Sequence, residues 1–303
     1  MSLRIIARHC ALLLLIAAAV ACERPFSEDD SKRKEDKTAT EDLVRLHVSA
    51  FSHTIVPFSQ RALAPKRASA VGDACTRLSF AIYKEAERVV SENQVSSDKD
   101  FGTLDVSLEK GTYRIVVIGH NGTGSATTKD LNKITFPNNK TTDTFYSSQE
   151  IDLDGDTNLS IELRRIVAMF RLVVTDKIPS EVAKMQFYYT GGSSTLDGAT
   201  GYGCVNSKQT EVREVTADMR NGNATFDIYT LPHSESGTLS ITVTAYDSND
   251  KAVKQSVFAD VEVKVNTIHQ YEGDFFSEEA DDGRSKLTVT VDDSWSDIIY
   301  SKY

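Results

Sequence analysis

The sequence predicts an all-β protein with two tandem β-sandwich domains, and three observations support this prediction. From about residue 42 onward, apolar side chains recur at every second position, which is the spacing that places them on one face of a strand. Runs of turn-forming residues, such as Pro137-Asn138-Asn139 and Gly191-Gly192, separate these segments. Helical spacing is scarce, and residues 179–184 form one of the few short helix candidates.

The number of predicted strands indicates two domains, because about 260 residues hold too many short strands for one small sandwich. We expect an N-terminal β-sandwich domain over residues 42–164 and a C-terminal one over residues 165–303. No internal repeat of roughly 20 to 50 residues is visible, which disfavours solenoids and propellers. The predicted strands, in order, are residues 43–51, 77–84, 103–108, 113–118, 157–163, 167–174, 182–189, 224–229, 238–246, 257–265 and 287–291.

Residues 1–21 have the layout of a lipoprotein signal peptide. Arg4 and Arg8 precede an unbroken apolar run over residues 11–21, which is too short to span a bilayer as a permanent helix. Small residues come immediately before Cys22, so cleavage there would make Cys22 the mature N-terminus and its thiol the site of acylation. Several acyl chains together give stable membrane anchoring. An ordinary secretory signal with an accidental cysteine and an N-terminal transmembrane helix are the alternatives.

Residues 22–41 form a charged segment that we expect to be a flexible linker, since it has too few apolar residues to fold. Its acidic patch Ser27-Glu28-Asp29-Asp30 resembles the tag that exports some lipoproteins to the outer face of the outer membrane, although a plain solvated linker also explains it.

The charge of the mature chain narrows the classes of partner. Removing residues 1–21 takes away two of the 34 basic side chains and none of the 44 acidic ones, so the net charge moves from −10 to −12. An acidic chain is unsuited to nucleic acid, which rewards clustered Lys and Arg. Membrane contact would have to come from the acyl chains and not from the protein surface.

The cysteines leave one pair to consider. Cys10 departs with the signal peptide and Cys22 would be acylated, so Cys75 and Cys204 remain in an oxidising compartment. Their separation in sequence says nothing of their separation in space. A disulfide and two free thiols both stay open.

The chain carries no recognisable catalytic or metal-binding motif. Its six histidines are scattered singly, without His-Glu-x-x-His or a nearby second ligand. Residues 119–124 are glycine-rich but lack the lysine of a phosphate loop, and residues 152–156 fit a solvated β-turn better than a calcium loop. No Gly-x-Ser-x-Gly occurs. We therefore expect no metal, no cofactor and no enzymatic activity.

A series of loose motifs runs in order through the chain after residue 74. They are Cys75-x-x-Leu78-x-Phe80-x-Ile82-Tyr83, residues 110–121, 143–146, 164–172, 178–179, 187–194 and 200–203, and Val291-Asp292-Asp293-Ser294-Trp295. In this order, and after a lipoprotein start, they resemble the FimA/FimB-like subunits of type V fimbriae. Within that family the chain looks most similar to the FimB-like anchor or accessory subunits.

The resemblance implies two transthyretin-like β-sandwich domains and a structural role in cell adhesion and fimbria assembly at the outer membrane. Other fimbrial subunits would be the partners, joined by β-strand addition, in which a donated strand satisfies an unpaired sheet edge and an empty apolar slot. Host or bacterial surface ligands are further partners. In polymerising shaft or tip members an arginine-specific protease removes the first strand, whereas an anchor would keep it.

Two arginines are candidates for such a cut. Arg61 and Arg67 are each followed by alanine in a small-residue loop between the first two predicted strands. The plainer interpretation is that they are loop cations. The C-terminal residues 295–303 are apolar enough to be either a last paired strand or a donated one.

A surface glycan-binding lipoprotein is the alternative function. Envelope β-sandwiches also bind sugars by stacking them on aromatic rings, and Tyr188, Tyr189 and Tyr202 could serve.

Overall fold

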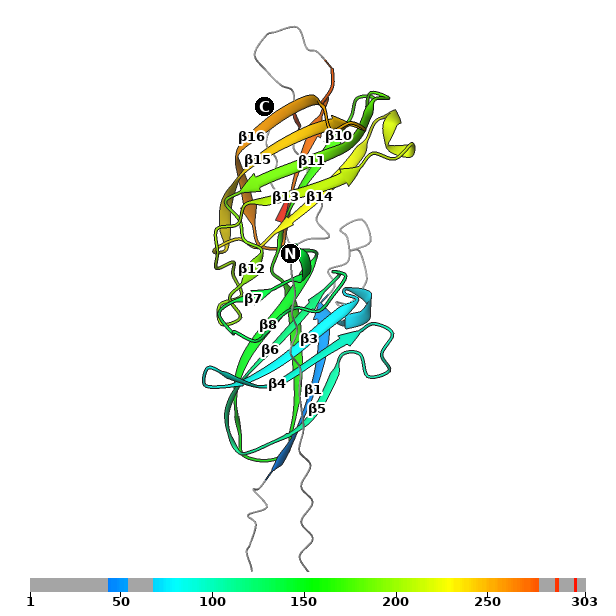
Figure 1. Ribbon diagram of the computed structural model, residues 1–303. Coiled ribbons are helices and arrows are strands. Elements are labelled where there is room, and N and C mark those ends of the chain that lie inside the picture. The colour runs from blue at the N-terminus through cyan, green and yellow to red at the C-terminus, as the bar shows by residue number, and fades with distance from the viewer. Residues whose placement is uncertain (1–42, 54–67, 278–286, 289–296, 299–303) are drawn as a thin grey trace, which may run out of the picture. The chain divides into compact units, whose positions relative to one another are not determined.

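A computed structural model describes residues 43–53, 68–277, 287–288 and 297–298, all within one compact unit that runs from Glu41 to Tyr303. These residues form strands joined by turns and three short 3-10 helices, which confirms the predicted all-β class (Figure 1). No helix in this part of the chain has the length and apolar character needed to cross a membrane. The predicted signal peptide and linker, with Cys22, lie outside the described residues.

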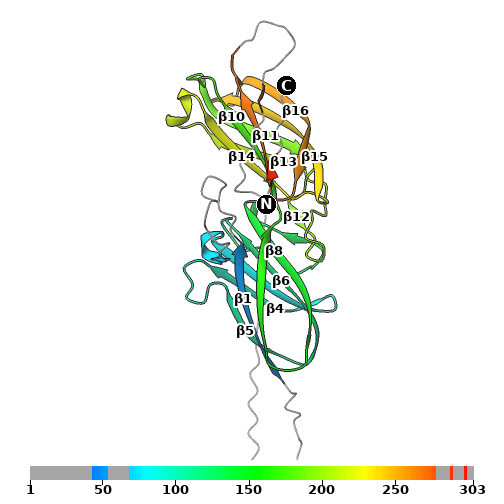
Figure 2. The same cartoon turned by 180° about the vertical axis from the view of Figure 1, so that it is seen from behind.

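The first half of the described chain is a sandwich of two β-layers. One layer has the order β5-β1-β9, with β2 on the end of β1, and the other has the order β4-β3-β6-β8 (Figure 2). Strands β8 and β9 join the layers through only two register pairs, Phe145 with Arg165 and Tyr146 with Arg164. The strands are β1 (Val44–His53), β2 (Ala68–Ala70), β3 (Arg77–Lys84), β4 (Glu87–Val95), β5 (Thr103–Leu108), β6 (Gly111–His120), β8 (Thr144–Leu153) and β9 (Thr157–Arg165).

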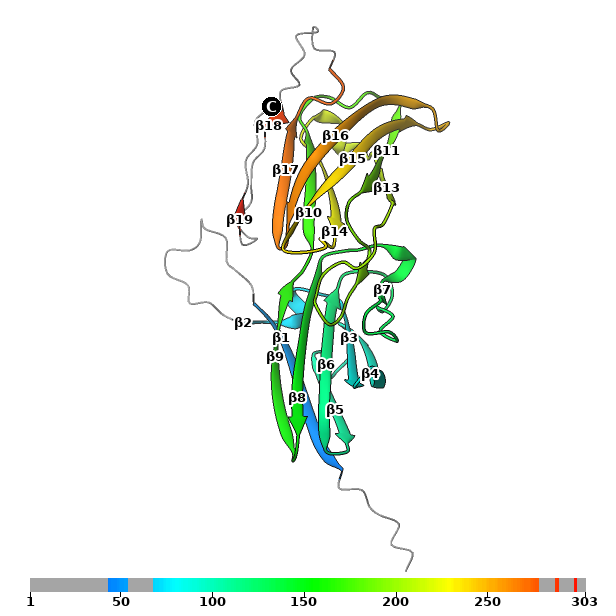
Figure 3. The same ribbon diagram turned by 90° about the vertical axis from the view of Figure 1, so that its left-hand side faces the viewer.

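The second half is a sandwich of the same kind (Figure 3). One layer has the order β14-β10-β17 and the other β13-β11-β15-β16, and two short strands, β18 (Leu287–Thr288) and β19 (Asp297–Ile298), pair with β17. Its strands are β10 (Ala168–Val174), β11 (Val182–Thr190), β13 (Gln209–Glu214), β14 (Ala224–Thr230), β15 (Ser236–Asp247), β16 (Ala252–Lys264) and β17 (Thr267–Gly273).

The two sandwiches share one topology. Strand β1 pairs antiparallel with β5 and parallel with β9, and β10 does the same with β14 and β17. In the opposite layers, the antiparallel ladders β4-β3-β6-β8 correspond to β13-β11-β15-β16. The chain therefore repeats one seven-stranded plan, although its sequence shows no repeat, because only the inward-facing apolar positions have to match.

Each sandwich has its own apolar core between its layers. Leu46, Phe80 and Ile115 are fully buried in the first core, and Phe170 and Phe187 are fully buried in the second. Alternate residues of each strand point inward, so the period-two pattern of the sequence is the direct source of both cores.

A third apolar cluster joins the two sandwiches. Tyr83 and Val116 on the outer face of β3 and β6 are buried together with Val167, Met169 and Ile268. Beside this cluster, the short strands β7 (Ile134–Thr135) and β12 (Thr195–Leu196) pair across the two halves. The predicted boundary between residues 164 and 165 falls at the end of β9. As a domain boundary it stays a prediction, because these contacts link both sides of it.

One prediction about local structure is wrong. The helix candidate over residues 179–184 instead enters strand β11 at Val182, whose side chain is fully buried. A β-branched residue with one face in the core favours a strand over an isolated helical turn.

Candidate functional site

Strand β1 occupies the centre of its layer. It makes six register pairs with β5, from Val44 with Leu108 to Ser49 with Thr103, and seven with β9. Leu46 and Val48 point into the core with no exposed surface, and Val44 is 7% exposed. The first described strand is therefore a structural part of the sandwich and not an appendage.

Removing β1 would create the kind of slot that a donated strand fills. The facing edges of β5 and β9 would lose their ladder partners, and the side chains that contact Leu46 and Val48 would face an apolar gap. Unpaired edges and exposed apolar surface are both satisfied when one extended strand is added. The geometry of the first sandwich thus allows strand exchange at β1.

The C-terminal end of β1 pairs with β2, the strand that follows the segment containing Arg61 and Arg67. Residues Phe51–His53 pair with β2, whose first residue, Ala68, follows Arg67 directly. Arg61 and Arg67 themselves lie in residues 54–67, outside the described residues. Cleavage in that segment would leave β1 attached to the rest of the protein only through pairing and packing.

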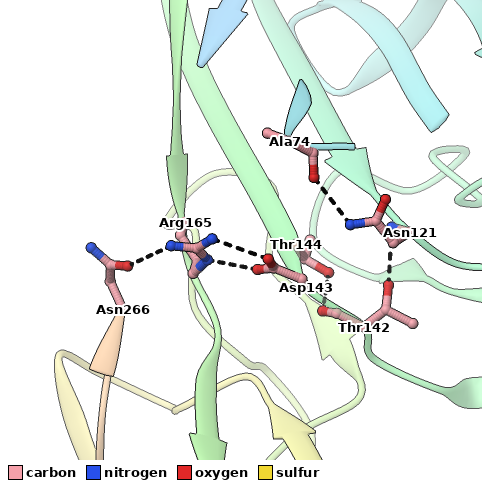
Figure 4. A network of polar contacts seen from close by, with 7 residues as sticks. All are labelled: Ala74, Asn121, Thr142, Asp143, Thr144, Arg165 and Asn266. Atoms are coloured by element: carbon pink, nitrogen blue, oxygen red, sulfur yellow. Dashed lines mark hydrogen bonds and ion pairs between the residues drawn. The ribbon is translucent and has the colours of Figure 1, made fainter. Parts of the chain in front are cut away.

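A polar network ties the first sandwich to the second (Figure 4). The Arg165 guanidinium at the end of β9 makes a bidentate ion pair with Asp143, with Nε to Oδ1 at 2.6 Å and Nη2 to Oδ2 at 3.0 Å. Nη1 of the same side chain donates to the Asn266 side chain at 3.3 Å, in the turn between β16 and β17. Arg165 also lies over the Phe145 ring at 4.7 Å. Sequence alone could not identify this link, because Arg165 and Asn266 are 101 residues apart.

The two cysteines that might form a disulfide are free thiols. Cys75 is buried in the first core, where its thiol donates to the Val71 carbonyl at 3.4 Å. Burial, with the nearby charge of Asp143, raises its pKa to about 12. Cys204 is exposed in the segment after β12, with its sulfur 3.3 Å from the Asn132 carbonyl. The structure does not bring the two together, so the disulfide alternative is not realised in it.

The three tyrosines considered for stacking lie in different environments. Tyr189 is buried in the second core, and its hydroxyl lies 3.1 Å from both the Glu211 carboxylate and the Tyr229 carbonyl. Tyr188 is 39% exposed on the outer face of β11. Tyr202 lies in a loop where it lines a cavity together with Tyr146. Only Tyr188 and Tyr202 are therefore open to a ligand.

The histidines include two that the sequence did not identify as buried. His120 at the end of β6 and His269 on β17 each accept a backbone N–H, from Gly122 at 2.9 Å and from Lys264 at 3.1 Å. Burial lowers the pKa of both to about 4, with Arg77 adding to the effect at His120. Within the described ranges, no group of three His, Cys, Asp or Glu side chains is placed to hold a metal ion.

Comparison with known proteins now assigns the family. The family model of the fimbrillin-A associated anchor proteins Mfa1 and Mfa2 matches residues 41–297, which is most of the chain. The protein belongs to this anchor family. The resemblance to anchor or accessory subunits that the sequence motifs indicated is thereby confirmed, and so is the place of the chain among fimbrial structural proteins. A search of curated protein sequences found no match.

Solved structures agree with the β-sandwich fold. A Bacteroides thetaiotaomicron protein described as polysaccharide-binding has a TM-score of 0.54 at 11% identity, over 86% of this chain and 98% of its own. A Bacteroides ovatus protein described as an adhesin has a TM-score of 0.50 at 11% identity, over 86% and 95%. The anchor protein Mfa2 from Porphyromonas gingivalis has a TM-score of 0.46 at 12% identity, over 86% and 100%. Because the sequence identities are low, the first two structures show that the β-sandwich fold is shared, and they are not evidence for a shared ligand.

Proposed function

We propose that this protein is a non-enzymatic fimbrial anchor or accessory subunit, held in the outer membrane by acyl chains on Cys22 and exposed at the cell surface. Membership of the anchor family supports the fimbrial part of the proposal. The basic, apolar and small-residue layout of residues 1–21 before Cys22 supports the lipid anchor.

One structural observation carries the proposal of an uncut anchor. With β1 in place, both of its neighbours are paired and the first core is closed by Leu46 and Val48. A subunit that retains β1 is therefore a complete fold that stays attached to its lipid through the linker. A cut after β1 and before β2, where Arg61 and Arg67 occur, would break the covalent link between the sandwich and its lipid.

We further propose that other fimbrial subunits bind by β-strand addition. The support is physical: a layered sandwich exposes strand edges whose N–H and C=O groups can pair with an extended segment. If the chain were instead a polymerising shaft or tip subunit, cleavage after Arg61 or Arg67 would remove β1 and a donated strand would replace it between β5 and β9.

Intact mass spectrometry of the native protein tests the anchor role. We expect a chain that starts at an acylated Cys22 and retains its C-terminus. A chain that starts at Ala62 or Ala68 would contradict the anchor role and support the polymerising one. A Cys22→Ser variant is the matched control: it should lose the acyl mass and partition into the soluble fraction, whereas the unmodified chain stays with the outer membrane.

The effect on fimbriae gives a second test. Deleting the gene should change the length, retention or abundance of fimbriae on electron micrographs. Unchanged fimbriae would count against a role in assembly or anchoring, even if the mass measurement finds lipid on Cys22.

A further inference from the structure

The junction of the two sandwiches contains a cavity of about 560 Å³. It opens at the place where the ladder between β8 and β9 stops. The last paired residues are Tyr146 and Arg164, and the strands then diverge into separate layers. Ser147, Ser148, Gln149 and Glu162, which would have been the next paired positions, line the cavity instead. A volume of this size is within the range of about 300 to 1,000 Å³ that holds small ligands.

The second sandwich supplies the other wall. Thr200, Gly201 and Tyr202 come from the loop after β12. Glu235, just before β15, and Val265, just after β16, lie together at the open end of the β15 and β16 hairpin. Two tyrosines, Tyr146 and Tyr202, thus line the cavity, one from each sandwich. Neither is fully buried, so each retains some exposed surface.

Both walls are held rigidly before any ligand arrives. The Tyr146 hydroxyl donates to the Gly198 carbonyl at 2.8 Å, and the loop closes on itself where the Gly201 N–H donates to the Asp197 carbonyl at 2.8 Å. Gly201 has φ of +83°, and a Cβ at this position would lie 2.7 Å from the Tyr146 ring. Glycine is therefore required for the loop to pack against that ring. On the β9 side, Arg165 is fixed by Asp143 and Asn266.

The charges that line the cavity do not favour an anion. Arg165 is already paired with Asp143, and Arg164 is outnumbered by two carboxylates, Glu162 and Glu235. The remaining polar groups are hydroxyls and an amide, which both donate and accept hydrogen bonds. A neutral, polyhydroxylated ligand with one apolar face satisfies such a mixture of hydrogen-bonding groups and aromatic rings. Sugar rings have that chemistry.

We propose that this cavity binds neutral saccharide, with Tyr202 as the principal stacking residue and Tyr146 as the rigid wall that positions the loop. Arg164, Glu235 and Gln149 donate hydrogen bonds to, or accept them from, the sugar hydroxyls. This site is separate from the β1 slot, so a subunit can bind saccharide whether or not it exchanges strands. The rigid walls favour affinity, because few side chains and loop residues have to become ordered when the ligand binds.

Affinity electrophoresis of the detergent-solubilised native protein tests the site. Native gels that contain mannan, dextran or pullulan should retard the protein in at least one polysaccharide. Tyr202→Ala should weaken that binding about tenfold, as expected for loss of one aromatic contact, while Tyr202→Phe should keep most of it because the ring remains. Tyr188→Ala is the matched control, since Tyr188 is an exposed tyrosine outside the cavity.

Two results would overturn the proposal. The first is free migration in all three polysaccharides, or retardation that Tyr202→Ala leaves unchanged while its thermal unfolding matches that of the unmodified protein. The second is binding of a synthetic peptide of residues 285–303 with no response to any polysaccharide, which would identify the gap between β8 and β9 as a strand-accepting edge instead.

Discussion

Strands β1 and β10 occupy the same position in two sandwiches of the same topology, yet they differ in how the chain holds them. β10 follows β9 after two residues and continues through residues 175–181 into β11, so it is covalently fixed at both ends. β1 has the linker from Cys22 on one side and residues 54–67, with Arg61 and Arg67, on the other. A single cut can free β1 but not β10. Whether a strand can be removed therefore depends on how it is connected to the rest of the chain and not on its position in the sandwich.

The largest expected effect comes from removing β1. A chain that starts at Ala68 lacks Val44, Leu46 and Val48, and burying each such side chain contributes about 1.5 to 3 kcal/mol. A loss of roughly 5 kcal/mol or more approaches the whole stability of a typical domain. We expect the first sandwich of this chain to be unfolded by near-UV circular dichroism and proteolysis, while the second stays protected.

Adding a synthetic peptide of residues 43–53 should restore the first sandwich, because the peptide supplies the same ladders and side chains. The same peptide with Leu46→Asp and Val48→Asp is the control and should not restore it. If the chain from Ala68 resisted proteolysis as well as the complete chain, β1 would not be needed to close the core.

Substitutions at equivalent core positions compare the two strands directly. Leu46 of β1 and Phe170 of β10 are both fully buried. Phe170→Ala should lower the free energy of unfolding by about 3 to 5 kcal/mol and Leu46→Ala by about 2 to 5 kcal/mol, measured by chemical denaturation. Arg45→Ala, at an exposed position of β1, should change it by less than about 0.5 kcal/mol.

Limited trypsin digestion should distinguish the Leu46→Ala variant from the Phe170→Ala variant. Leu46→Ala should speed the release of a fragment that contains β1, since weaker packing would hold this fragment less firmly once trypsin has cut at Arg61 or Arg67. Phe170→Ala should not release a fragment ending at β10. Equal fragment patterns from both variants would remove the proposed distinction between the strands.

The success of the sequence prediction depended on which residues face inward. Strands β1, β3, β6, β10 and β15 have apolar side chains at every second position, and the sequence predicted all of them. Four strands of six or more residues were missed, and each carries a polar residue at a buried position: Gln94 in β4, Thr144 in β8, Glu211 in β13 and His269 in β17. Hydrogen bonds satisfy such residues in the structure, as between Gln94 and the Thr103 carbonyl at 2.6 Å. The alternation of apolar and polar residues in the sequence does not reveal these hydrogen-bond partners.

The candidate site was less accessible from sequence than the fold. The sequence suggested Tyr202 as a candidate stacking residue, but the other residues that line the cavity with it, among them Tyr146, Arg164 and Glu235, come together only through the topology. Tyr189 has the same residue type as Tyr188 and lies next to it. Because a strand alternates its faces, Tyr189 is in the core while Tyr188 is outside.

Each sandwich contains one buried neutral histidine, so both should lose stability in acid. A histidine in an unfolded chain has a pKa near 6.5, whereas burial lowers the pKa of His120 and His269 to about 4. Between these values the unfolded chain binds a proton that the folded chain excludes. Stability is therefore complete above pH 6.5 and falls as the pH drops toward 4, by up to roughly 3 kcal/mol for each histidine.

Substituting one of these histidines should distinguish the acid sensitivity of one sandwich from that of the other. His269→Gln removes the titration in the second sandwich, so its unfolding temperature should change less between pH 7 and pH 4.5 than in the unmodified protein. His233→Gln is the control, since it replaces an exposed histidine with the same residue. The same acid sensitivity in His269→Gln and the unmodified protein would show that other groups govern it.

The smallest expected effect concerns the side-chain contacts that cross from β1 and β10 to their antiparallel neighbours. His47 pairs with Asp105 at 2.7 Å and Arg171 with Asp227 at 2.7 Å, and each pair joins residues directly opposite in register. The arginine pair is bidentate and more buried, with side-chain exposures of 23% and 30% against 38% and 77%. Arg171→Ala should therefore cost about 1 kcal/mol and His47→Ala less than about 0.5 kcal/mol in chemical denaturation. Double-mutant cycles with Asp227→Ala and Asp105→Ala would separate the coupling energy of each pair from the loss of packing.

A larger coupling energy for His47 with Asp105 than for Arg171 with Asp227 would mean that β1 is held at its surface as firmly as β10. In that case its removal would depend less on the position of the cut and more on replacement by a competing strand.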